Sequence, residues 1–67
     1  MSYSFCWQTR ENAPVGIYRK QEGLRFIAHA VQYYHELSGD IVKAWIERVD
    51  GIDVCLIKWL KGDNHAI

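Results

Sequence analysis

The sequence predicts an α+β fold: a small, mainly antiparallel sheet in the element order β-β-α-β-β, with one helix packed across one face. Three observations support this prediction. Residues 2–8, SYSFCWQ, alternate between bulky apolar and smaller or polar side chains, as a half-buried strand does. Residues 20–37 repeat apolar side chains at helical spacing. Residues 44–59, AWIERVDGIDVCLIKW, place an Asp-Gly pair between two apolar runs, which is a strong hairpin signal.

The length limits the chain to one domain. We expect residues 1–67 to form it, with residues 61–67 as a frayed polar tail. A domain of this size buries only about 60% of the surface that its unfolded chain exposes. Such domains often depend on a disulfide, a metal or a partner. Apolar residues make up 49% of the chain, which argues against disorder.

The N-terminal part is expected to supply the first two strands. Within residues 2–8, Tyr3, Phe5 and Trp7 share one side of the predicted strand. A polar loop follows it. Residues 15–19, VGIYR, are then a candidate for a short second strand that returns against the first.

We predict one helix over residues 20–37, KQEGLRFIAHAVQYYHEL, from its length and its apolar period. The apolar arc spans well over half of the helical wheel. Its members are Leu24, Ile27, Ala28, Val31 and Tyr34, together with Phe26, Ala30, Tyr33 and Leu37. One sheet face cannot cover an arc this wide, so we expect part of it to stay uncovered.

Asp50 and Gly51 are expected to be the central residues of the hairpin loop, because a type I′ turn needs positive φ at both positions. In this register Arg48 faces Asp53, and the two should form an ion pair at the rim. The register directs one hairpin face toward the helix, namely Val42, Ala44, Ile46, Cys55, Ile57 and Trp59.

The opposite hairpin face is the predicted interaction surface. A solvated sheet face normally alternates to polar residues more strictly than this one does. Apolar patches rimmed by charge also mark protein–protein interfaces. With two helix residues added, the candidate interface residues are Trp45, Leu56, Val54, Lys43, Lys58, Phe26 and Tyr33. The alternative is that the N-terminal segment covers this surface within the same chain.

Charge does not point to a polyanionic partner. Eight Lys and Arg residues balance eight Asp and Glu residues, which weakens functions that need a strong overall field. Nucleic-acid binding on the open sheet face is the alternative function, because Lys43 and Lys58 flank Trp45 and an aromatic ring can stack on a base. Glu47 on the same face and the lack of an RNP-like motif argue against it.

No motif for catalysis, a cofactor or a metal is present, and we expect none of the three. Cys6 and Cys55 are far apart in the sequence and are expected to be reduced thiols, with Cys55 facing the core; a bridge between them is the less favoured alternative. His29 and His35 lie about 240° apart on a helix, so they cannot bind one ion from one face.

The N-terminus has no basic and apolar regions of the kind that form a signal peptide. No apolar run approaches the roughly 20 residues that cross a bilayer. We therefore expect a cytoplasmic protein that does not contact membranes. The preferred function is a non-enzymatic module that binds a protein partner, itself as a homodimer, or both. In size and lack of catalytic motifs the chain resembles small accessory or inhibitor proteins of phages and mobile elements, which is a resemblance of type only.

Overall fold

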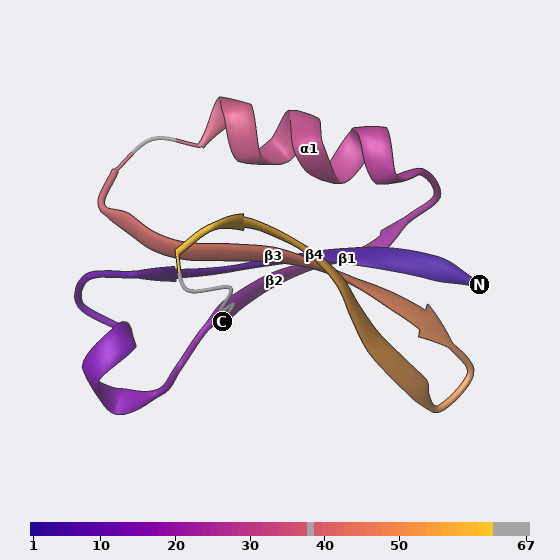
Figure 1. The fold of residues 1–67 in the computed structure, drawn as a ribbon, viewed down its shortest axis with the longest axis horizontal. Coiled ribbons are helices and arrows are strands. Elements are labelled where there is room, and N and C mark those ends of the chain that lie inside the picture. Colours follow the sequence, from indigo (N-terminus) through magenta and orange to yellow (C-terminus); the bar gives the residue numbers. More distant parts are fainter. Residues whose placement is uncertain (38, 63–67) are drawn as a thin grey trace.

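A computed structural model describes residues 1–37 and 39–62. One antiparallel sheet contains four strands: β1 (Ser2–Thr9), β2 (Arg19–Leu24), β3 (Ile41–Asp50) and β4 (Asp53–Lys61). Their order across the sheet is β2-β1-β3-β4, so β2 and β4 are the edges. Helix α1 (Ile27–Glu36) covers one face, and the β1–β2 connection, with the short 3₁₀ helix η1 (Ala13–Val15), lies on the other side of the sheet (Figure 1). The predicted α+β class and element order are confirmed.

The core lies between α1 and the two inner strands. Phe5 of β1 is fully buried opposite Ile46 of β3, and its ring stacks on Trp7 at 5.1 Å between centroids. Tyr3, Phe5 and Trp7 share one side of β1, as predicted, and the structure places that side against the helix. The core residues are Phe5, Leu24, Ala30, Ala44 and Ile46, and around them pack Tyr3, Trp7, Val31, Tyr34, Leu37, Ile41 and Leu60.

The predicted helix over residues 20–37 is wrong in its first third. Residues 19–24 form β2, which pairs with β1, and the predicted strand over residues 15–19 begins instead at Arg19. Pairing with β2 supplies hydrogen-bond partners for the second edge of β1, which a helix could not do. Gly23 adopts φ 76, a conformation that interrupts a helix, and the β1–β2 register shifts beside it.

The hairpin is confirmed, but its loop lies one residue later than predicted. Asp50 pairs with Asp53, so Gly51 and Ile52 are the loop residues. Gly51 has φ 65 at the first central position, where both type I′ and type II′ turns require a positive φ. Arg48 consequently faces Cys55, and the expected pairing with Asp53 does not form.

Two irregularities in the β3–β4 pairing change which side chains face the helix. Glu47 pairs with Leu56 but Ile46 pairs with Lys58, so Ile57 is an extra residue on β4. Trp59 therefore lies beside Trp45 on the face away from α1, with 5.2 Å between ring centroids, and the predicted helix-facing position of Trp59 is wrong.

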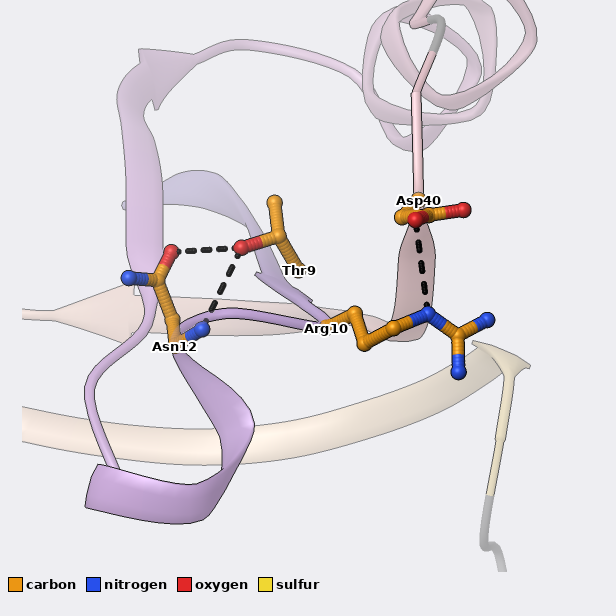
Figure 2. Close-up of polar contacts among 4 residues, drawn as sticks. All are labelled: Thr9, Arg10, Asn12 and Asp40. Atoms are coloured by element: carbon orange, nitrogen blue, oxygen red, sulfur yellow. Dashed lines mark hydrogen bonds and ion pairs between the residues drawn. The ribbon is translucent and has the colours of Figure 1, made fainter.

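The connection after β1 is held by local polar contacts (Figure 2). The Thr9 hydroxyl donates to Asn12 Oδ1 at 2.8 Å and accepts from the Asn12 backbone N–H at 3.3 Å. Arg10 pairs with Asp40, which follows the helix, at 3.3 Å between Nε and Oδ2. That ion pair is exposed and contributes little stability. The Thr9–Asn12 contacts instead shape the turn that returns the chain beneath the sheet.

Strand β4 ends at Lys61, and Gly62 directly after it lies against β3. The predicted tail of residues 61–67 starts later, because Lys61 still belongs to β4, and residues 63–67 lie outside the described residues. Gly62 has φ 93, and a Cβ there would lie 2.8 Å from the Val42 carbonyl oxygen. Both the conformation and the close approach require glycine at this position.

We expect Gly62→Ala to lower the free energy of unfolding by about 2 kcal/mol or more, because it combines left-handed strain with a backbone collision. Gly16→Ala is the matched control, since Gly16 has φ 75 with nothing within 4 Å of the added Cβ. Urea unfolding of both variants measures the difference. Equal losses in the two variants would show that the close approach at Gly62 does not matter.

Candidate interaction surface

The two edge strands of the sheet differ in how they meet solvent. β2 has the sequence RKQEGL, which is short, charged and interrupted by Gly23. Natural proteins protect sheet edges with such charges and irregularities. β4 has the sequence DVCLIKWLK, which is longer and begins with four apolar residues after Asp53. The β2 edge of this sheet is therefore protected against pairing with another chain, and the β4 edge is much less protected.

Apolar side chains along the β3–β4 hairpin are exposed on both faces of the sheet. Val54 and Leu56 are 53% and 47% exposed on the face away from α1. Ile57 and Cys55 are exposed as well, and Ile52 at the tip is 97% exposed. Within the described residues, no element packs over this part of β4. The expectation that Cys55 and Ile57 meet the helix is therefore wrong, because α1 lies over β1 and its two neighbours.

Trp45, the centre of the predicted interaction surface, is covered within the chain. The residue is only 9% exposed. Tyr18 from the β1–β2 connection and Trp59 from β4 contact its ring, at 5.3 and 5.2 Å between centroids. The connection is tied to β1 by a hydrogen bond from Gln8 Nε2 to the Ile17 carbonyl oxygen, 3.1 Å long. The segment after the first strand thus covers this half of the open face, while β1 itself pairs in the sheet.

The remaining predicted interface residues do not form one patch. Lys43 shares the face of Trp45, but Lys58 is paired with Ile46, whose side chain points toward α1. Phe26 and Tyr33 are exposed on the helix, which lies on that same side. The structure therefore brings together Val54 and Leu56 and separates Phe26 and Tyr33 from them. Their role at an interface stays a prediction.

Glu47 organises the polar part of the open face. Trp45 Nε1 donates a hydrogen bond to Glu47 Oε2 at 3.0 Å. Lys20 Nζ from β2 lies 3.3 Å from Glu47 Oε1 and 5.6 Å from the centroid of the Tyr18 ring. The Lys20 and Glu47 side chains are 26% and 14% exposed, so solvent only partly screens their attraction. These contacts hold β2, β3 and the β1–β2 connection together.

The ionised form of this pair is favoured. Burial alone would raise the pKa of Glu47, but the hydrogen bond from Trp45 and the nearby Lys20 ammonium outweigh it and lower that pKa. Burial alone would likewise lower the pKa of Lys20, and the contact with Glu47 outweighs it and raises that pKa. Both groups are therefore charged at neutral pH.

A shallow hollow of about 450 Å³ lies beside this pair, across β1, β2 and the hairpin. Its lining residues are Ser2, Ser4, Lys20, Glu22, Gly23, Val49 and Val54. The Ser4 hydroxyl is buried and has no hydrogen-bond partner among the described residues. Because Val54 lines the hollow, the exposed apolar surface of β4 is continuous with a more polar surface formed by residues of β1 and β2.

The two thiols lie in different environments. Cys6 is fully buried beneath the Lys20–Glu47 pair, and this burial, with the nearby Glu47 carboxylate, raises the pKa of the thiol to about 12. Cys55 is exposed on β4. Both are free thiols, and β3 separates their strands. A buried thiol with so high a pKa is unsuited to act as a nucleophile at neutral pH.

Metal binding finds no support in the described part of the chain, which contains no group of three or more His, Cys, Asp or Glu side chains close enough to hold an ion. None of the helices in residues 1–37 and 39–62 is both long and apolar enough to cross a bilayer.

Sequence reasoning did not identify Cys55 and Ile57 as surface residues. Their apolar types favoured the core, and only the strand order places β4 at an edge. The one local signal is the composition of the second apolar run, which has no charge between Asp53 and Lys58. Comparisons of the chain with protein-family models, with curated proteins and with solved structures give no match.

We expect one thiol to react quickly with a small aromatic disulfide reagent in the native protein and two in denaturant, because Cys6 is buried and Cys55 is exposed. Cys55→Ser should remove the fast reaction, whereas Cys6→Ser should leave it. Absorbance of the released thiolate measures both. A fast native reaction that persists in Cys55→Ser would contradict this placement of the thiols.

Acid should weaken the fold through Glu47. Because its folded-state pKa is lowered, its contribution to stability is complete above the ordinary glutamate pKa of 4.5 and is lost as the pH falls through the folded-state value. We expect Glu47→Gln to cost about 2 kcal/mol at neutral pH, the typical value of a hydrogen bond to a charged group, and much less in acid.

Urea unfolding of wild type and Glu47→Gln, from neutral pH to below pH 4.5, measures how the stability cost of the substitution changes with pH. Glu11→Gln, on the exposed connection after β1, is the control and should change stability little at either pH. A cost of Glu47→Gln that stays the same from neutral to acidic pH would rule out a role for the Glu47 charge.

Proposed function

We propose that this chain is a non-enzymatic interaction module that binds a protein partner, or a second copy of itself, by adding a strand to the β4 edge. The observation that carries the proposal is the contrast between the two edges of one sheet. β2 is charged and irregular, while β4 presents exposed Val54 and Leu56 beside a backbone edge that pairs with no other strand in residues 1–37 and 39–62.

Strand addition uses two kinds of contact, and β4 offers both. Backbone N–H and C=O groups on the outer edge supply hydrogen bonds that need no particular sequence. Alternate side chains then give specificity, since each face of the added strand meets a different set of neighbours. Val54 and Leu56 would meet the partner on the open face, and Cys55 would meet it on the helix side.

The size of the domain also supports a binding role. Among the residues that the structure describes, five apolar residues form the buried core cluster, which is a small core for a domain of this size. Burying one further Leu or Val side chain contributes about 1.5–3 kcal/mol. A strand laid along β4 would therefore stabilise both the complex and the domain. Location in the cytoplasm is consistent with this proposal, which includes an accessory or inhibitor role.

The alternative function, nucleic-acid binding through Lys43, Trp45 and Lys58, lacks a supporting contact. The Trp45 ring lies between Tyr18 and Trp59 and is not free to stack on a base. Lys58 is directed to the other side of the sheet from Lys43.

We expect Leu56→Lys to weaken association at β4 at least tenfold, which corresponds to about 1.4 kcal/mol. It replaces an exposed apolar contact with a charge while leaving the core intact. Sedimentation velocity from micromolar to millimolar concentration measures self-association, and affinity capture from host extract measures binding of other proteins. Both use the full chain.

Gln32→Lys is the matched control, because Gln32 is exposed on α1 and far from the hairpin. Association that is lost in Leu56→Lys and kept in Gln32→Lys supports the proposal. Association that survives Leu56→Lys, or its absence in both assays, overturns it.

A further inference from the structure

Pairing of β4 with a second copy of itself is restricted by the backbone of the hairpin. In a hairpin closed by a two-residue loop, the flanking pair, here Asp50 and Asp53, is a hydrogen-bonded pair. Hydrogen-bonded and non-hydrogen-bonded pairs then alternate along the ladder. The backbone of Cys55 is therefore directed toward β3, whereas Val54 and Leu56 direct their N–H and C=O groups out from the sheet edge.

Only a few registers let those outward groups pair with each other in a symmetric antiparallel dimer. A dyad at Val54 leaves Leu56 opposite the hairpin loop. A dyad at Leu56 places Val54 opposite Lys58 of the second copy, and Lys58 is turned to the other face by the extra residue Ile57. A dyad at Cys55 pairs Val54 with Leu56 of the second copy and Leu56 with Val54, entirely ahead of that irregularity.

We propose that the chain forms a twofold-symmetric dimer in which β4 pairs antiparallel with β4 of a second copy, with the two Cys55 residues facing each other on the axis. This inference rests on the proposed function, and it names the partner and the register. Such a contact is isologous and closes at two subunits, joining two four-stranded sheets into one.

Side-chain chemistry agrees with this register. On the open face, Val54 of each copy meets Leu56 of the other, so exposed apolar surface is covered by apolar surface. On the helix side, Asp53 lies opposite Ile57 of the second copy and next to its Lys58, so an acid and a base come together twice by symmetry. Direct opposition of like charges, which destabilises a sheet, does not occur between the paired residues 53–57.

The interface is short, so the dimer should be weak. A five-residue pairing buries less area than a standard protein–protein interface, and we expect dissociation in the micromolar range or above. The position of Cys55 provides a direct test of the register. Non-hydrogen-bonded antiparallel pairs have Cα atoms about 4.5 Å apart, which lies within the range that a disulfide spans.

The experiment treats the full chain with diamide and follows dimer formation on non-reducing gels. Two Cys55 thiols lose two protons and two electrons to form one S–S bond, and the azo group of diamide takes them up to become a hydrazine. We expect wild type to cross-link readily and Cys55→Ser to form no covalent dimer, since Cys6 is buried. Adding Leu56→Lys to wild type should slow cross-linking at least tenfold.

A shifted cysteine controls for random collision. In the Cys55→Ser background, Ile57→Cys places the only exposed thiol two residues away, opposite Asp53 of the second copy, and it should cross-link at least tenfold more slowly than wild type. If Ile57→Cys cross-linked faster than wild type, the twofold axis would lie nearer residue 57 than Cys55, and this register would be wrong. A monomer at millimolar concentration would overturn the dimer, while capture of another protein that Leu56→Lys abolishes would leave the proposed function standing.

Discussion

Helix α1, which has ten residues, shields the apolar face of a four-stranded sheet. The width of this helix decides which strands have one face buried from solvent. A helix with its side chains is about 10–12 Å across, and neighbouring strands lie about 4.8 Å apart. The helix can therefore shield two or three strands. It lies over β1 and the strands on either side of it, where Phe5 and Ile46 are completely buried. The first half of β4 lies beyond its reach, so the apolar side chains of Val54, Leu56 and Ile57 remain in water, whereas Leu60 near the end of the strand packs against the core.

The sheet face away from α1 is covered by a connection and an ion pair instead of a helix, and only over part of its width. The β1–β2 connection brings Tyr18 onto Trp45, and the charged pair of Lys20 and Glu47 fixes the neighbouring strands. Desolvation offsets much of the attraction within such a partly buried ion pair, whereas removing one partner leaves the other charge uncompensated. This half of the sheet is thus covered on both faces, while the first half of β4 is exposed on both. That asymmetry within one small domain is the reason that we propose binding at β4.

Local sequence patterns predicted the elements correctly where the pattern fitted only one type of secondary structure. The alternation around Phe5 and the Asp-Gly pair at the hairpin were both recognisable without tertiary information. The segment from Lys20 to Leu24 was not, because Leu24 suits a helix face and a strand end equally well. Its strand conformation depends on β1, which is distant in the chain and needs a partner for its free edge.

For the candidate site, the sequence by itself determined that the hairpin has apolar side chains on both faces, that Val54 and Leu56 share one of them, and that the helix has more apolar surface than one sheet face can cover. Only the tertiary structure decided that β4 is an edge, that Trp45 is covered by Tyr18, and that Trp59 turns away from the helix. Strand order, loop placement and the extra residue at Ile57 arise from pairings between distant segments. A periodic pattern indicates which side chains share a face of a strand, but it does not indicate which other strand will pair with it.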